Sequence, residues 1–125
     1  MTNYNLGDFL IRLKNCVMAS RSELEVPATK IVTQAAKALK VAGFIAEIIE
    51  DKETLKIKMA MKNKKPTLMD IRLVSKPGLR IYKTIAEIEK IKKPFILLIS
   101  TPKGFLTSKE AIKERVGGEV IAEIL

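Results

Sequence analysis

The sequence predicts an α+β fold made of two small, packed α/β parts. Three observations lead to this prediction: helical and strand patterns alternate over residues 5–62, a polar segment with a proline follows, and short apolar strands dominate beyond it. We expect residues 1–62 to form a helix-strand-helix-strand-strand unit. Residues 63–125 are expected to form a mostly β unit with a short helix.

The first predicted helix spans residues 5–20, where apolar residues recur at helical spacing. Asn5, with Asp8 three residues later, gives a plausible N-terminal cap. The apolar stripe of this helix consists of Leu6, Phe9, Leu10, Leu13, Cys16 and Val17. Because Cys16 falls on the stripe, we expect it to be a core residue.

A short strand and a second helix follow. The strand is predicted at Leu24–Pro27. The helix after it should end at Gly43, because glycine readily adopts the left-handed conformation of a helix C-cap. The predicted buried stripe of this helix consists of Ile31, Ala35, Ala38, Leu39 and Ala42. The small alanines suggest that the helix packs closely on a sheet.

Two strands complete the N-terminal unit, at residues 44–50 and 54–62. In the second strand the alternation is nearly perfect, with Lys56 and Lys58 on one face. The opposite face consists of Leu55, Ile57, Met59 and Met61. We therefore expect both methionines to fill the core.

The C-terminal unit should begin with a strand at residues 68–74 and a turn. Pro77 and Gly78 suit the two central positions of a type II turn, which needs a positive φ at its second corner. A short helical stretch around residues 85–91 should then lead to an apolar strand at residues 95–100. We expect this strand to be buried on both faces.

A short helix and a final strand are predicted next. Thr107 and Glu110 have the spacing of a capping box, so a helix is expected to start there. Gly117 and Gly118 are expected to end it, and residues 119–125 should return as a strand.

The chain is strongly basic, and its charge is unevenly spread. It has 23 Lys+Arg against 14 Asp+Glu, a net charge of +9 and a pI near 9.7, with 47% hydrophobic residues to build a core. Residues 62–83 hold seven basic side chains and one acid, whereas residues 44–53 hold four acids and one lysine. A basic folded domain points to a polyanion, most often nucleic acid. The lysines Lys62, Lys64 and Lys65 should form a solvated linker or hairpin tip.

Other classes of protein are disfavoured. The longest clean apolar run has five residues, which is far short of a membrane span, and the first residues do not resemble a secretory signal. A single cysteine gives no disulfide framework, so a reducing compartment is expected. The absence of histidine removes the commonest general base and most zinc sites. We expect no metal.

The stretch from Ser100 to Gly104 allows three interpretations. Ser100 and Lys103 match the S-x-x-K pattern of serine acyl-transfer enzymes, in which the lysine lies one helical turn after the serine. Pro102 and Gly104 instead favour a turn between a strand and a helix, which could be a bare connection. Hydroxyls, one cation and a glycine beside a helix N-terminus could also bind phosphate and ribose in structured RNA.

Several segments together resemble the bacterial small-subunit ribosomal protein S8 family. The matching segments, in order along nearly the whole chain, are Gly7–Asn15, Val26–Lys30, Val74–Lys83, Ser100–Ala111 and Gly117–Ile121. The resemblance implies two small α/β parts, with no enzymatic activity and no cofactor. It implies a structural constituent of the small subunit that binds its ribosomal RNA directly and early and helps to organise the central domain.

The resemblance also assigns the RNA-binding residues. The main contact is implied to be the loop of Ser100, Thr101, Pro102, Lys103 and Gly104, aided by Tyr82 and Glu119. Thr29 and Lys30, in the N-terminal part, should touch a second RNA segment more lightly. The family usually has a serine where this chain has Pro102, which removes a hydroxyl and an N–H and stiffens the loop.

Partners and location follow from the same resemblance. Ribosomal RNA and neighbouring small-subunit proteins are the expected partners, without a membrane, and the protein is expected to be monomeric off the ribosome. The expected place is the cytoplasmic ribosome or that of a bacterial-type organelle. Some family members also control their own messenger.

Individual residues keep alternative interpretations. Lys103 could bind a phosphate or be a solvated turn lysine. Tyr82 could contact RNA or lie half-buried on a strand, and Glu119 could accept from a base or 2′-OH or be a surface carboxylate. Lys76 and Arg80, beside the predicted turn, are further candidates for phosphate contacts. The rival functions are a serine acyl-transfer enzyme and a protein–protein adaptor.

Overall fold

The computed structural model describes residues 6–76, 78–91 and 96–125, and these residues form two compact units. One unit runs from Met1 to Asp70 and the other from Ile71 to Leu125, whereas the sequence analysis divides the chain after Lys62. Both units combine helices with antiparallel sheets, which confirms the predicted α+β class. Asn5, Pro77 and Phe95, to which the sequence analysis gave a cap, a turn and a strand start, lie outside the described residues.

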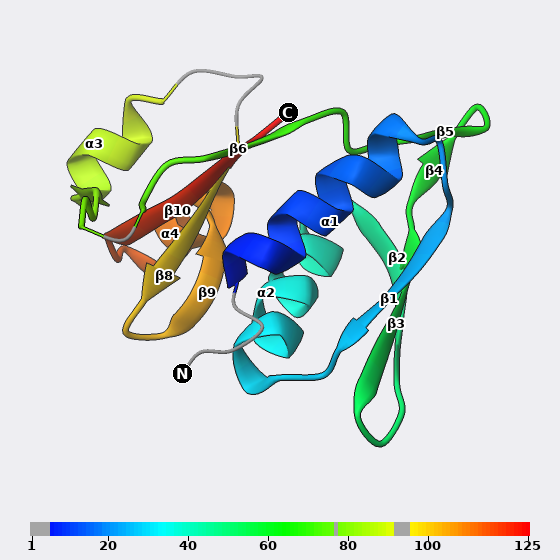
Figure 1. Ribbon diagram of the computed structural model, residues 1–125. Coiled ribbons are helices and arrows are strands. Elements are labelled where there is room, and N and C mark those ends of the chain that lie inside the picture. Colours follow the sequence, from blue (N-terminus) through cyan, green and yellow to red (C-terminus); the bar gives the residue numbers. More distant parts are fainter. Residues whose placement is uncertain (1–5, 77, 92–95) are drawn as a thin grey trace. The chain divides into compact units, whose positions relative to one another are not determined.

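The first unit contains two helices and five strands among its described residues. Their bounds are α1 Leu6–Met18, β1 Glu23–Pro27, α2 Lys30–Val41, β2 Ile45–Glu50, β3 Thr54–Met59, β4 Met61–Lys62 and β5 Lys65–Pro66. The sheet has the order β1-β3-β2, and α1 and α2 lie on one of its faces (Figure 1). The strands β4 and β5 form a separate hairpin.

The core of the first unit follows the predicted stripes with two exceptions. On α2, Ile31 is 51% exposed and its neighbour Val32 is fully buried, so the stripe is shifted by one position at its start. Met61 is 41% exposed, whereas Met59 is buried as predicted. The reason is that the backbone of Ala60 has two different hydrogen-bond partners. Its N–H donates to the carbonyl of Phe44, and its own carbonyl accepts the N–H of Thr67. The alternation of β3 therefore ends before Met61.

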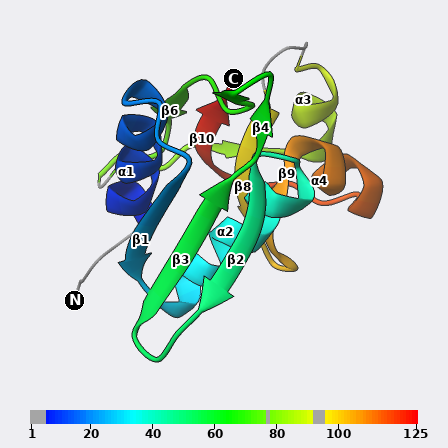
Figure 2. The ribbon, with the colours of Figure 1, turned by 90° about the vertical axis from the view of Figure 1, so that its right-hand side faces the viewer.

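The second unit has a sheet of five strands and two short helices among its described residues. Their bounds are β6 Ile71–Leu73, β7 Tyr82–Lys83, α3 Ile85–Glu89, β8 Ile96–Thr101, β9 Gly104–Thr107, α4 Ser108–Glu114 and β10 Gly118–Ile124. The strand order is β6-β10-β8-β9, and β7 pairs with the first residues of β10. The last strand thus occupies a central position, which Figure 2 shows between β6 and β8.

The core of the second unit lies between the sheet and its two helices. Ile88 of α3 and Ala111 of α4 pack with the apolar residues of β8 and β10. Leu97, Leu98 and Ile99 are all buried, which confirms that β8 is covered on both faces because successive side chains point in opposite directions.

Two predictions about α4 are wrong. Thr107 precedes the helix, but its side chain makes no capping hydrogen bond, and the neighbouring Ser108 hydroxyl accepts the N–H of Leu97 at 3.2 Å. The helix ends at Glu114 with Arg115 in the left-handed conformation, φ 58°, so Gly117 and Gly118 do not end it. A complete capping box instead starts α3, between Thr84 and Glu87.

Candidate nucleic-acid interface

Four side chains from four strands lie on one transverse row of the second sheet. Glu119 of β10 is directly opposite Tyr82 of β7 and also directly opposite Ser100 of β8. Ser100 in turn is opposite Phe105 of β9. Directly opposed residues point to the same face of a sheet. The row Tyr82–Glu119–Ser100–Phe105 therefore brings three sequence-predicted site residues side by side, and we call it the Glu119 row.

The close approach of strands at this row depends on two glycines. A Cβ at Gly118 would lie 2.1 Å from the carbonyl oxygen of Ser100, and a Cβ at Gly117 would lie 2.4 Å from that of Lys83. Real Cβ atoms essentially never come that close. Only glycine therefore fits at these two positions, and their role is strand packing.

One serine holds the segment before β7 against β10. The hydroxyl of Ser75 donates to the carbonyl of Val120 at 2.7 Å and accepts the N–H of Ile81 at 2.9 Å. The N–H of Val120 also donates to the carbonyl of Ile81 at 2.8 Å. These bonds fix Ile81 against β10, and with it the neighbouring Tyr82.

A two-residue turn at Pro102 and Lys103 joins β8 to β9 beside the Glu119 row. Gly104 follows with φ 105°, and Thr101 and Gly104 pair across the turn. A proline with its fixed φ, one further residue and a glycine at positive φ are typical of a type I turn with a glycine bulge. The turn therefore projects Pro102 and Lys103 as its exposed corner.

The Thr101 hydroxyl stabilises this turn from inside. It accepts the N–H of Lys103 at 3.0 Å and donates to the carbonyl of Gly104 at 2.8 Å. Its proton is therefore used within the loop, whereas no hydrogen bond of the Ser100 hydroxyl is seen within the described part of the chain. Ser100 is the hydroxyl that remains available to a ligand.

Two ion pairs flank the row. Arg80 lies 3.1 Å from Glu119, whose side chain is only 15% exposed, and Lys103 lies 3.4 Å from Glu114. Both cations are more than half exposed, so each pair is worth at most about 1 kcal/mol. Arg80 compensates the charge of Glu119, and Lys103 can leave Glu114 for a phosphate at little cost.

An open pocket of about 600 Å³ lies over this region. Its lining residues come from three segments that the fold brings together, namely Tyr82–Ile85 with Glu87, Ser100–Pro102 and Gly117–Glu119. An exposed tyrosine ring, a free hydroxyl and a carboxylate border the same space. Such a pocket can hold a base or a ribose, because it offers a surface for stacking together with hydrogen-bond partners.

Similarity to known proteins extends over nearly the whole chain. The family model described as "Ribosomal protein S8" matches residues 5–125. The chain belongs to the ribosomal protein S8 family. It is 38% identical to the small ribosomal subunit protein uS8 of Trichodesmium erythraeum, over 98% of this chain and 97% of that protein. It is 41% identical to the protein of that name from Streptococcus pneumoniae, over 95% of each.

Membership of the ribosomal protein S8 family makes this chain a structural protein and not an enzyme. The geometry of Ser100 and Lys103 also differs from that of S-x-x-K enzymes. Ser100 lies in a strand and Lys103 in a turn, so they do not share a helix face, and the ammonium group pairs with Glu114. Within the described residues, no group of three potential metal ligands is found, and no helix is long and apolar enough to span a bilayer.

The remaining predicted residues of this S8 family member are not members of the Glu119 row. Lys76 is exposed and forms an isolated β-bridge with Leu79. Thr29 caps α2 of the first unit by accepting the N–H of Val32 at 3.2 Å, and Lys30 is the exposed first residue of that helix. Thr29 therefore has a structural role whatever else it contacts.

Sequence analysis missed several members of the site. Phe105 lies on the Glu119 row because Gly104–Thr107 is a strand, whereas the sequence analysis expected a helix N-terminus directly behind the loop. The two-residue turn Pro102-Lys103 followed by glycine is a hairpin signal that could have revealed β9. Thr84 and Glu87 show the capping-box spacing that the analysis assigned elsewhere.

Proposed function

We propose that this protein, as a structural constituent of the small ribosomal subunit, binds the subunit's RNA directly through the Glu119 row and the Pro102–Lys103 turn. The observation that carries the proposal is the register that places Tyr82, Glu119 and Ser100 side by side over one pocket, next to an exposed cation. Family membership and the net charge of +9 support it.

Each member of the site has a distinct role toward folded RNA. The exposed Tyr82 ring stacks on a base or sugar, and the Ser100 hydroxyl exchanges hydrogen bonds with a 2′-OH or a base edge. The Glu119 carboxylate accepts from a base amino group or a 2′-OH, with Arg80 offsetting its repulsion of phosphate. Lys103 binds a phosphate.

Pro102 acts on the loop and not through a donor of its own. It has no N–H, and its ring fixes φ at the first corner of the turn. Together with the two hydrogen bonds of Thr101, it orders the loop before RNA arrives. Less conformational entropy is then lost on binding, which offsets the missing serine hydroxyl.

The proposal extends to the surroundings of the protein. Its partners are the small-subunit RNA, whose central domain it helps to organise, and neighbouring small-subunit proteins; it is monomeric off the ribosome and has no membrane role. Control of its own messenger would use the same interface on a helix of similar shape. A footprint on the messenger leader tests that part.

The main test replaces Lys103 with alanine. The variant loses one charge-assisted hydrogen bond to phosphate. Because Lys103 gives up its weak ion pair with Glu114 when it binds RNA, the net loss of binding free energy should be about 1–2 kcal/mol, or roughly fivefold to thirtyfold in affinity. The slope of log K against log salt should become shallower by about 0.7–0.9. Binding to a transcript of the central domain is measured by fluorescence anisotropy at several salt concentrations.

The matched control for Lys103→Ala is Lys109→Ala, which removes the same charge from the exposed face of α4. It should leave the slope unchanged. If both variants bind as tightly as the wild type, the turn does not contact RNA, and the proposed site is wrong.

A further inference from the structure

The three-stranded sheet of the first unit has two edges that differ in their free backbone groups. Its strand order is β1-β3-β2, and Figure 2 shows β1 and β2 on either side of β3. Each edge strand turns every second N–H and C=O away from β3, and such groups can pair with a strand of another chain. The edge at β1 is closed by the protein itself, whereas the edge at β2 is open.

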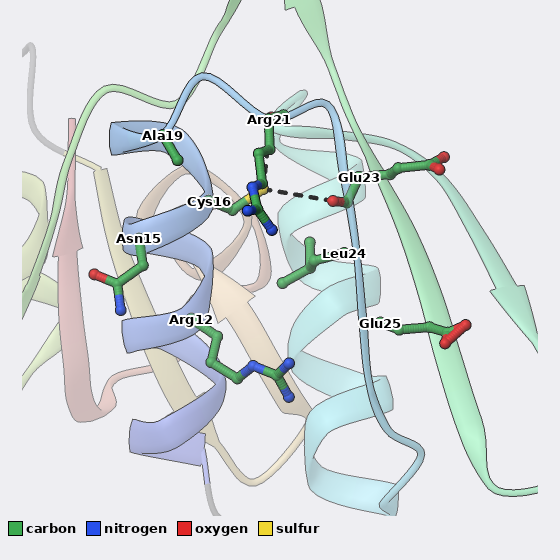
Figure 3. Close-up of a pocket in the computed structure, with 8 residues that line it drawn as sticks. All are labelled: Arg12, Asn15, Cys16, Ala19, Arg21, Glu23, Leu24 and Glu25. Atoms are coloured by element: carbon green, nitrogen blue, oxygen red, sulfur yellow. Dashed lines mark hydrogen bonds between the residues drawn. The ribbon is translucent and has the colours of Figure 1, made fainter.

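The edge at β1 is closed by a helix residue and a proline. Residues 22 and 28 form hydrogen bonds on the β3 side, so the backbone groups of residues 23, 25 and 27 point to the free side. There the carbonyl oxygen of Glu23 lies 3.8 Å from the Sγ of Cys16, on α1 (Figure 3). Pro27 has no N–H, and its carbonyl accepts the N–H of Thr29 at 3.1 Å. A further strand would find few free groups on this side.

The edge at β2 is open over residues 47–50. Asp51 and Thr54 exchange two backbone hydrogen bonds, of 2.9 and 3.2 Å, at the end of the β2–β3 hairpin. From this pair the ladder alternates, so Ile49 bonds to β3, and the N–H and C=O groups of Ile48 and Glu50 point to the free side. No partner for these groups is found in the part of the chain that the structure describes, and β2 contains no proline. Both residues can therefore bond to an added strand.

The side chains along this edge are two carboxylates and an exposed isoleucine. Glu47 is 52% exposed and lies 3.6 Å from Lys58, and Glu50 is 58% exposed and lies 3.7 Å from Lys37. Ile49 shares the outer face of the sheet with Glu47 and is 41% exposed. An ionised carboxylate has two oxygens with about four acceptor positions. Each glutamate can therefore take a second cation from the open side while it keeps its lysine.

The charge of this edge selects what can pair with it. Residues 44–53 hold four acids and one lysine, in a chain whose net charge is +9. A second copy of β2 would bring acidic residues against acidic residues, and like charges on facing strands are destabilising. The phosphates of RNA are repelled as well, and RNA has no peptide backbone to continue the ladder. An extended protein segment with basic side chains meets both requirements.

We propose that residues 47–50 of β2 bind an extended, basic segment of a partner protein as an additional strand of the sheet. The side chains of that segment opposite Glu47 and Glu50 are lysine or arginine, and those opposite Ile48 and Ile49 are apolar. The inference rests on the proposed function only for the source of this segment, a neighbouring small-subunit protein. The contact itself is independent of the Glu119 row and needs no RNA.

The first test uses the full chain and a peptide with blocked ends, Thr-Lys-Val-Val-Lys-Thr. Its sequence reads the same in both directions, so it matches either strand orientation. Hydrogen exchange of the backbone amides is measured by NMR. At a peptide concentration ten times the Kd, exchange at Ile48 and Glu50 should slow about tenfold. Exchange at Ile49, which already bonds to β3, should change less.

The control peptide Thr-Glu-Val-Val-Glu-Thr has the same shape and the opposite charge. It should leave the exchange of Ile48 and Glu50 unchanged, because its glutamates face Glu47 and Glu50. Unchanged exchange with the basic peptide overturns the inference, and so does equal protection by both peptides. This measurement uses the wild-type protein and does not depend on a variant that folds.

Two charge variants test the role of the carboxylates. Glu47→Gln with Glu50→Gln should weaken binding of the basic peptide by roughly threefold to tenfold, as expected for two exposed ion pairs. The matched control is Glu23→Gln with Glu25→Gln, which removes the same charge from exposed residues of β1, at the closed edge. If the two variants bind the basic peptide equally, the acidic edge does not select its partner, and the proposal is wrong.

The assembled small ribosomal subunit provides the last test. A photo-crosslinking residue in place of Ile49 should form a crosslink to a basic segment of another protein. A crosslink to RNA or to a second copy of this chain overturns the inference. If Lys103→Ala weakens RNA binding but the basic peptide does not protect Ile48 and Glu50, only the edge assignment fails. If the peptide protects them but the wild-type protein does not bind the transcript, the proposed RNA-binding function fails and the edge assignment stands.

Discussion

Replacement of Gly118 by alanine tests how strictly strand packing controls the proposed RNA-binding site. In a strand with open space, alanine would be favoured over glycine by about 0.5–1 kcal/mol, because glycine loses more backbone entropy on folding. Here the new Cβ would lie 2.1 Å from the Ser100 carbonyl oxygen, and real contacts essentially never fall below 3.0 Å. The two backbones must therefore separate by at least about 0.9 Å, the difference between these distances.

This separation acts on stability and on binding together. Overpacking of a buried contact costs about 1–3 kcal/mol, and the neighbour here is backbone, which cannot rotate away. For a chain of this size the melting temperature should fall by roughly 3–12 °C. Since Ser100 is the residue displaced, the Glu119 row should open, and RNA affinity should fall even at temperatures where the variant is folded.

The assay combines thermal unfolding by circular dichroism with RNA binding well below the melting temperature. A Gly118→Ala variant with unchanged or higher stability would show that the strands yield without cost, and the steric reasoning would be refuted. A destabilised variant with normal RNA affinity would show instead that the Glu119 row does not need this spacing.

Two further predictions concern the turn and the first helix of the second unit. Thr101→Val keeps the shape but removes both hydrogen bonds of the hydroxyl, so we expect a loss of about 1–2 kcal/mol and faster hydrogen exchange of the Lys103 amide. Unchanged exchange would mean that the hydroxyl does not hold the turn. Hydrogen bonds from the N–H and hydroxyl of Thr84 lower the pKa of Glu87 below 4.5, so its contribution to stability is present above that pH and is lost as the pH falls through the lowered pKa. Between pH 6 and pH 3, the free energy of unfolding should fall more steeply with decreasing pH for the wild type than for Glu87→Ala. Parallel curves for the two proteins would contradict a stabilising role of the Glu87 carboxylate.

Local patterns in the sequence were sufficient for most elements of the fold. The period of two over residues 54–59 and the helical stripe of α1 report burial directly, because each depends only on neighbours along the chain. Where two adjacent positions carry similar side chains, as at Ile31 and Val32, the pattern does not fix the phase of the helix. The spacing of a capping box is also ambiguous in the sequence. It occurs at Thr84 and at Thr107, but only the box at Thr84 forms.

The geometry of the site could not be read from local patterns. Tyr82, Ser100 and Glu119 were each identified through the family resemblance, but their common row depends on the register of strands about 20 to 40 residues apart. That register is set by non-local packing, including the missing Cβ atoms at Gly117 and Gly118.

The central position of β10 has a consequence for protein synthesis. Its partners β6, β7 and β8 all precede it in the chain, so a nascent polypeptide that stops before Gly118 contains Tyr82 and Ser100 but no strand to join them. The Glu119 row can therefore form only after this strand has been translated.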